Sequence, residues 1–208
     1  PLTIEASDFR RARVGTYLDA GAFPNKGIFR AYPEPALRNT QVALRKWSEG
    51  DLDCVRQATT DVTIPQRPTF PAVYSPDTAL AFIHRQWGRL TGTEGISLAI
   101  AHPGTDEALG LMVLLYREEK GVVGIGYWIV PNARRQGFAS AAAELLSRWA
   151  LTEVSVSRVE AHVQPGNDAS EHTLIAAGFR PEGLLRSYLG YAAHRSDALV
   201  FSRIQADL

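Results

Sequence analysis

The stretch WIVPNARRQGFASAAAELL, residues 128–146, joins an apolar run to a segment rich in small residues. A proline ends the apolar run, which is typical of a strand that leads directly into a helix. The first backbone N–H groups of such a helix have no partners, and the helix dipole adds partial positive charge there. Gly137 and Ala139 leave the backbone uncovered at this point, while Arg134 and Arg135 add full charges. The stretch therefore predicts a cradle for a diphosphate.

The composition excludes several classes of protein. Hydrophobic residues make up 45% of the 208 residues and charged residues 21%, which is typical of a globular chain with one large domain. Basic and acidic side chains balance at 22 each, so no general attraction to nucleic acid or to an anionic membrane is expected. Cys54 is the one cysteine and the five histidines are scattered, so neither a disulfide nor a metal site is expected. No membrane span or signal-peptide pattern is present, which predicts a cytoplasmic protein.

Periodicity along the chain predicts an α+β fold. Residues 1–38 show no sustained period and are interpreted as an arm or small extension, so the main domain is expected over 39–208. Ser48 and Ser75 are expected to cap two helices, and the four prolines within 61–76 predict an ordered loop that frames a binding mouth. Two more helices are expected at about 138–151 and 167–177, and strands at 42–45, 96–101, 109–116, 122–130, 158–163, 179–187 and 197–204. This order predicts a mostly antiparallel sheet with helices on both faces.

Three motifs, in order along the chain, resemble those of one known family. They are GYWIVP (126–131) leading into Arg134-x-x-Gly137-x-Ala139, VEAHV (159–163) followed by Pro165, Asn167 and Ser170, and AGFR (177–180) followed by Glu182 and Gly183. Together they resemble the GNAT superfamily of acyl-CoA-dependent N-acetyltransferases, particularly its RimJ/RimL-like branch. The resemblance covers about residues 40–205. It implies the GNAT fold, a mixed sheet of about six or seven strands splayed in a V.

The resemblance also implies the donor and where it binds. Acetyl-CoA is expected to lie in the V, between the strand ending at Val130 and the strand ending at Val163. In this family the first of these strands pairs with the pantetheine arm through its backbone, here at Ile129 and Val130. The amides implied to hold the diphosphate belong to Arg134, Arg135, Gln136, Gly137, Phe138, Ala139 and Ser140. Asn167 is implied to contact the pantetheine region, and it is equally suited to cap the helix that it precedes.

Acetyl transfer to an amine needs a base, a donor for the developing oxyanion and a proton for the departing thiolate. In the branch that modifies ribosomal-protein alanine, a Glu base and a Tyr acid occupy the positions of His162 and Leu174. Leu174 cannot donate a proton, so the peptide specificity of that branch is not transferred. His162 is interpreted either as a base, with Glu160 orienting or replacing it, or as a strand histidine that is merely solvated or hydrogen-bonded where the strands splay. Ser170 is interpreted either as the acid, as in RimL-like enzymes, or as a local hydrogen bonder at a helix start.

The expected activity is transfer of an acetyl group from acetyl-CoA to a primary amine by direct attack, without a covalent enzyme intermediate. The acceptor stays open between a protein N-terminal α-amine and a small-molecule amine. Tyr188, Tyr191 and His194 either line its pocket or are surface side chains of a hairpin. The alternative is a non-catalytic acyl-CoA-binding module that senses the donor or regulates a partner, which the missing tyrosine favours. A homodimer with residues 1–38 as a contact is compatible with the sequence.

Overall fold

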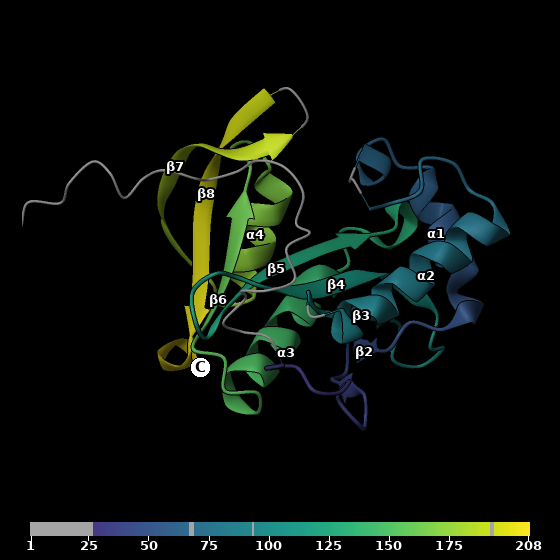
Figure 1. The fold of residues 1–208 in the computed structure, drawn as a ribbon, viewed down its shortest axis with the longest axis horizontal. Helices are drawn as coiled ribbons and strands as arrows, with labels where there is room; N and C mark the ends of the chain where they lie inside the picture. Colours follow the sequence, from purple (N-terminus) through teal and green to yellow (C-terminus); the bar gives the residue numbers. More distant parts are fainter. Residues whose placement is uncertain (1–26, 67–68, 93, 192–193) are drawn as a thin grey trace, which may run out of the picture.

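The computed structural model describes residues 27–208 except 67–68, 93 and 192–193, and its strands form an eight-stranded sheet (Figure 1). The strands are β1 (Leu37–Arg38), β2 (Ala43–Arg45), β3 (Gly95–Ala101), β4 (Ala108–Tyr116), β5 (Val122–Ile129), β6 (Arg158–Val163), β7 (Arg180–Tyr191) and β8 (His194–Ile204). Their order is β1-β2-β3-β4-β5-β6-β8-β7, and all neighbours are antiparallel except β5 and β6. The α+β fold class is confirmed. The strand beyond the predicted six or seven is β1, whose two residues are too few to give a sequence pattern.

The helices follow the predicted order, and their predicted caps are present. The α-helices of the described residues are α1 (Leu52–Thr59), α2 (Pro76–Thr91), α3 (Phe138–Thr152) and α4 (Asp168–Ala176). Ser48 accepts a hydrogen bond from the Gly50 amide in the 3-10 turn η2 (Glu49–Asp51) that leads into α1. Ser75 accepts one from the Thr78 amide at the start of α2. These side chains bind N–H groups that the helices cannot satisfy internally, and so they fix where the helices begin.

The first face of the sheet is covered by α1 and α2. Ser97 of β3 donates a hydrogen bond to Gln86 of α2 at 3.1 Å, and both side chains are buried. Trp128 of β5 packs on the same face, with its ring centroid 6.3 Å from that of Phe82 in α2 and 5.5 Å from that of Phe70. Phe70 lies in the proline-rich segment, so that segment is anchored to the sheet through an aromatic cluster.

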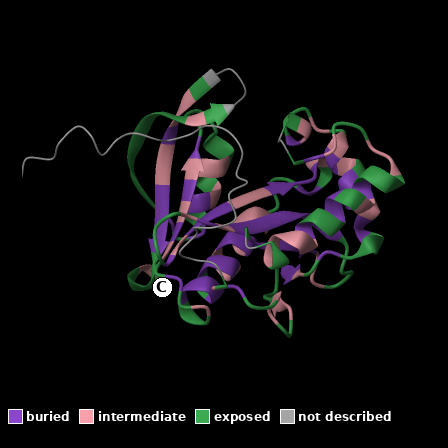
Figure 2. Cartoon of the chain, viewed as in Figure 1, coloured by how far each residue is buried: buried purple, intermediate pink, exposed green. Residues whose placement is uncertain are grey.

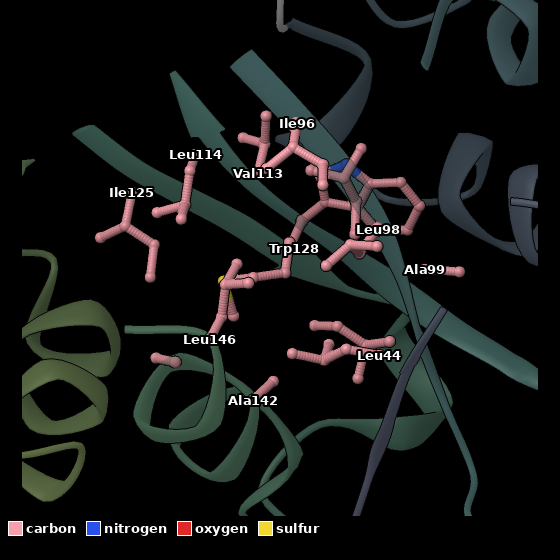
Figure 3. Close-up of a cluster of buried hydrophobic side chains, with 14 of the residues drawn as sticks. Leu44, Ile96, Leu98, Ala99, Val113, Leu114, Ile125, Trp128, Ala142 and Leu146 are labelled. Carbon is pink, nitrogen blue, oxygen red and sulfur yellow. The ribbon is translucent and has the colours of Figure 1, made fainter. Parts of the chain in front are cut away.

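The opposite face is covered by α3, with α4 beside it. Figure 3 shows Ala142 and Leu146 of α3 directed toward the strands, close to Leu44 of β2, and all three are fully buried. Strands β3 and β4 are buried along almost their whole length, whereas β7 at the end of the sheet is exposed (Figure 2). A continuous apolar strand fits this position because both of its faces are covered.

The parallel pair β5–β6 divides the sheet. The two strands pair only from Val122 with Arg158 to Gly124 with Glu160. Beyond these three pairs, β5 continues along β4 and β6 continues along β8, and the two strands diverge (Figure 1). The backbone edge of β5 from Ile125 onward is therefore not covered by β6. This divergence is the V that the resemblance implies.

Residues 27–38, part of the predicted arm, pack against the main core. The Phe29 ring is buried and stacks on Tyr116 and Trp149, with centroid separations of 5.4 and 5.9 Å. Its amide donates a hydrogen bond to the Tyr116 hydroxyl. Residues 1–26 lie outside the described part of the chain, and so does any role of that segment in a dimer contact.

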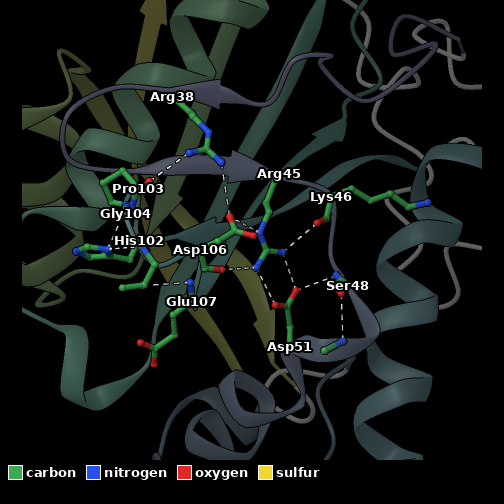
Figure 4. A network of polar contacts seen from close by, with 12 residues as sticks. Arg38, Arg45, Lys46, Ser48, Asp51, His102, Pro103, Gly104, Asp106 and Glu107 are labelled. Carbon is green, nitrogen blue, oxygen red and sulfur yellow. Dashed lines mark hydrogen bonds and ion pairs between the residues drawn. The ribbon is translucent and has the colours of Figure 1, made fainter.

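A polar network joins β2 to the start of α1 and to the turn between β3 and β4 (Figure 4). Arg45 donates two hydrogen bonds of 2.8 Å to Asp51 and one of 3.0 Å to Asp106. Asp51 is buried, and it also accepts a hydrogen bond from the Ser48 amide. Because a buried carboxylate is stable only with such partners, the network fixes the position of α1 on the first face of the sheet.

Candidate active site

The end of β5 presents one backbone residue to the opening of the V. The Val130 amide donates to the Leu109 carbonyl of β4 at 2.9 Å, so Val130 points away from the opening. Because backbone groups alternate along a strand, the N–H and carbonyl of Ile129 point toward the opening. Arg134 Nε binds that carbonyl at 3.0 Å. Of the two residues expected to pair with pantetheine, Ile129 is the one whose backbone faces the gap.

The turn from β5 into α3 holds a row of backbone amides without partners. Arg135 and Gly137 both have positive φ, 61° and 80°, which turns successive N–H groups toward one side. Within the described residues, the amides from Arg135 to Ser140 donate no hydrogen bond, and the Ala141 amide is the first to do so, to the Gly137 carbonyl. A row of such amides at a helix N-terminus is a site for an anion. The structure thus brings residues 135–140 together as the sequence predicts, but the Arg134 amide, which was also expected in this row, donates to the Pro131 carbonyl instead.

Gln41 braces this turn from a distant part of the sequence. Its side-chain amide donates to the Gln136 carbonyl at 2.9 Å, across 95 residues of sequence. A Cβ at Gly137 would lie 2.5 Å from Gln41 Nε2, so a larger residue would be strained by the φ of 80° and would displace the Gln41 side chain. Sequence reasoning missed Gln41 because a single glutamine before a short strand carries no signal of a contact so far along the chain.

Arg134 is engaged by protein rather than left for an anion. Its guanidinium lies 2.7 Å from Asp61, whose side chain is only 7% exposed. Burial alone would raise the pKa of Asp61, but hydrogen bonds from Thr63, Arg134 and the Ile64 amide outweigh burial and hold that pKa well below its usual range. Arg135 is exposed and makes no ion pair among the described residues. The charge available beside the amide row is therefore that of Arg135.

Glu160 and His162 of β6 lie on the first face of the sheet, the face that α1 and α2 cover elsewhere. The Glu160 carboxylate lies 3.4 Å from Arg117 Nε, 3.3 Å from Arg158 Nε and 3.5 Å from His162 Nε2. Arg117 reaches it by lying across Gly124, where a Cβ would come within 2.3 Å of the guanidinium. Glu160 is thus held by two arginines.

The environment of His162 favours its neutral form. Its side chain is 8% exposed. Burial is the largest effect and lowers the pKa of His162. The charge of Arg117 lowers this pKa further, and Glu160 offsets only part of the decrease. A buried neutral imidazole beside a carboxylate can accept a proton. This environment suits the interpretation of His162 as a base, which stays a prediction.

The start of α4 lies against β5. Asn167 caps α4 by accepting the Ser170 amide at 3.3 Å. The Ser170 carbonyl accepts the Tyr127 hydroxyl of β5 at 3.2 Å, while the Ser170 hydroxyl makes no hydrogen bond within the described chain. Leu174 is fully buried, and its hydrocarbon side chain cannot supply a proton. The side chains of Tyr191 and His194 lie outside the described residues.

Other chemistry finds no support among the described residues. Burial raises the pKa of the Cys54 thiol well above its usual value, which disfavours a nucleophilic thiolate. No group of three or more metal-binding side chains comes together in the part of the chain described. None of the described helices combines the length and the apolar composition that a bilayer crossing requires.

Comparison with known proteins agrees with this geometry. The sequence pattern of the acetyltransferase (GNAT) domain family matches residues 41–180. An uncharacterised N-acetyltransferase of Bacillus licheniformis, p20, is 34% identical over 104 residues, which span 50% of this chain and 58% of that relative. YoaA of Bacillus subtilis, another uncharacterised N-acetyltransferase, is 25% identical over 82% of this chain and 97% of its own length.

A solved structure shares the fold. Mycobacterium smegmatis RimJ, determined in complex with CoA-disulfide, superposes with a TM-score of 0.69 at 23% sequence identity. The superposition covers 80% of this chain and 83% of that one. Because the family pattern spans well over half of the sequence and the divided sheet is present, the chain belongs to the GNAT family of acetyltransferases.

Proposed function

We propose that the protein transfers the acetyl group of acetyl-CoA to a primary amine by direct attack of the amine on the thioester. The observation that carries this proposal is the row of unpartnered amides from Arg135 to Ser140, placed where β5 and β6 diverge. A diphosphate is the ligand that suits such a row, and Arg135 adds charge beside it. The CoA-disulfide bound to the related RimJ fold supports the same assignment.

The open edge of β5 suits the pantetheine arm of the donor. Ile129 directs its amide toward the opening, where an extended chain with its own amide groups can pair as an additional strand. Asn167, exposed at the start of α4, keeps its side-chain N–H₂ available while its oxygen caps the helix. In this proposal both groups orient the donor and neither takes part in the bond changes.

On the acceptor side, we assign His162 as the base. During transfer the amine nitrogen bonds to the acetyl carbon, the thiolate departs, and the proton lost by the amine passes to His162. Glu160 is less suited to this role because two arginines hold its charge. Donation to the thiolate is assigned to Ser170, whose hydroxyl is without a partner in the described structure.

The environment of His162 points to a weakly basic acceptor. At pH 7 an α-amine with a pKa of about 7.7–8.0 is roughly a tenth to a sixth neutral, whereas a lysine amine is neutral about once in 2,500 molecules. A histidine whose pKa is lowered is a weak base, so it assists the first kind of amine far better. We therefore propose a protein N-terminus or a small α-amine as the acceptor.

The test is an acceptor-dependent assay. The protein is incubated with acetyl-CoA and with peptides and small molecules that carry either an α-amine or a side-chain amine, and free thiol is followed over time. Thiol release that depends on the α-amine compounds, with the acetylated amine found by mass spectrometry, is expected. Binding of acetyl-CoA without acceptor-dependent thiol would instead support a sensor or regulatory module.

A further inference from the structure

Strand β7, which pairs with β8, is irregular between Leu185 and Leu189. Leu185 pairs with Ala198 and Leu189 pairs with Ser196, so four steps along β7 face only two along β8. Ser187, inside this bulge, has a φ of 53°. A non-glycine residue rarely adopts this conformation, and a bulge that holds it commonly redirects a side chain beside a functional site.

Two charged side chains of β8 hold the bulge in place. Asp197 accepts the Ser187 amide at 2.7 Å. Arg195 donates from Nε to the Ser187 carbonyl at 2.6 Å and from Nη2 to the Tyr188 carbonyl at 3.0 Å. In the bulge, the Ser187 amide and the carbonyls of Ser187 and Tyr188 are thus bound by charged side chains. Charge-assisted hydrogen bonds of this kind are strong.

The bulge places the Tyr188 ring against His162. The two ring centroids are 4.7 Å apart and the planes meet at 75°, an edge-to-face contact. Tyr188 is 46% exposed, whereas the His162 side chain is 8% exposed. The tyrosine ring therefore covers the imidazole on a side that would otherwise face water.

We propose that Tyr188 is a positioning residue that fixes the His162 imidazole and shields it from water, and that Asp197 and Arg195 hold Tyr188 in this place. The catalytic meaning of this role rests on the proposed function, since it requires His162 to be the base. The contact between Tyr188 and His162 does not depend on the proposed function, and its effect can be measured in the protein without substrates.

The charges that face His162 are those of Glu160 and Arg158 on its own strand and of Arg117, which follows β4. A substitution at Tyr188 removes none of these charges. Burial is the largest cause of the low pKa of His162. Opening the imidazole to water by removing the ring is therefore expected to raise the pKa of His162 toward its ordinary value of about 6.5.

The experiment is an NMR titration of the His162 imidazole in the full chain without ligands. Tyr188→Ala is expected to raise the pKa of His162, and Tyr188→Phe, which keeps the ring, to leave it as in the wild type. Asp197→Ala is expected to shift it in the same direction as Tyr188→Ala, while Asp197→Asn keeps an acceptor oxygen for the Ser187 amide and rescues the wild-type value. Ser187→Gly, which adopts positive φ freely, is the matched control inside the bulge and is expected to titrate as the wild type does.

An unchanged His162 titration in a folded Tyr188→Ala protein would overturn the proposal. So would an equal shift in Tyr188→Phe, because the effect would then belong to the hydroxyl rather than the ring. Because Tyr188 is nearly half exposed, folding of these variants is expected and is checked by thermal unfolding.

Turnover gives the second readout. For an acceptor with a fixed amine pKa, Tyr188→Ala is expected to move the acid limb of kcat/KM in the same direction as the NMR value and to lower kcat by up to about a hundredfold. If the NMR shift occurs and acetyl transfer is absent even in the wild type, the proposed function fails while the positioning role stands.

Discussion

His162 combines a side chain that is only 8% exposed with a carboxylate 3.5 Å away. Burial and the neighbouring arginines lower its pKa, and Glu160 is too engaged with Arg117 and Arg158 to reverse this effect. The imidazole is therefore neutral at pH 7 and ready to accept a proton.

We expect His162→Ala to lower kcat by about a hundredfold or more, because positioned proton transfer contributes 10²–10⁴-fold. In the wild type, kcat/KM should fall as the pH drops below about 6.5, since protonation of a group with a lowered pKa occurs only below its ordinary value. The measurement is the pH profile of kcat/KM with an acceptor of low amine pKa. A limb above pH 7 that His162→Ala leaves unchanged would remove His162 from the mechanism.

The turn 135–140, here called the donor turn because we propose that it binds the acetyl donor, depends on Gly137. We expect Gly137→Ala to weaken acetyl-CoA binding by at least about tenfold, because it adds strain at a φ of 80° and places a Cβ 2.5 Å from Gln41 Nε2. Gly121→Ala is a close control, with a φ of 78° and a Cβ 2.7 Å from Ser157 Oγ, at the other end of β5. Calorimetric titration with CoA measures both variants, which should lose similar stability. Equal loss of affinity in the two would show that the turn has no special role.

The sequence predicts part of the site at this scale. Local pattern and resemblance both point to Gly137 and Ala139, whereas His162 is indicated by the resemblance alone. The sequence does not indicate Gln41 or Asp61. Gln41 acts through a contact with the donor turn 95 residues away, and Asp61 acts through its ion pair with Arg134. Arg134 was expected to serve the anion, and only its packing shows that Asp61 engages it.

At the scale of elements, the ends of helices and strands are predictable where a local rule sets them. The caps at Ser48 and Ser75 and the strand 158–163 follow from side-chain chemistry and alternation. The loop after α1 is different, since it is fixed to the donor turn by the Asp61–Arg134 pair. Asp61 also accepts the amides of Thr63 and Ile64, at 2.8 and 2.9 Å.

We expect Asp61→Ala to lower the free energy of unfolding by about 1–3 kcal/mol at pH 7, because it leaves two amides and part of a guanidinium without partners. The pKa of Asp61 is lowered on folding, so this contribution is present above its ordinary pKa of about 3.9 and is lost as the pH falls below it. Urea unfolding of wild type and variant from pH 7 downward measures the difference, which should narrow below about pH 4. Asp61→Asn retains an acceptor oxygen and should lose less. A difference that is constant with pH would contradict the ion-pair account.

For the whole molecule, the decisive feature is the short parallel contact between β5 and β6. Its three residue pairs join two antiparallel halves that then diverge, and the donor turn and His162 lie on the two sides of that divergence. The helices and strands were predictable from periodicity, but the divergence was known only from the family resemblance. No local pattern encodes the length over which two strands pair, because that length depends on contacts between residues far apart in the sequence.

The central claim is that the opening between β5 and β6 is the donor site and that the amides of 135–140 hold the diphosphate. Hydrogen–deuterium exchange of these amides, with and without CoA, tests it most directly. In the free protein they should exchange rapidly because they have no hydrogen-bond partners in the described structure, and saturating CoA should protect them strongly. Amides of the turn at 117–121, at the other end of β5, should be unaffected. Rapid exchange at 135–140 in the presence of bound CoA would contradict the account.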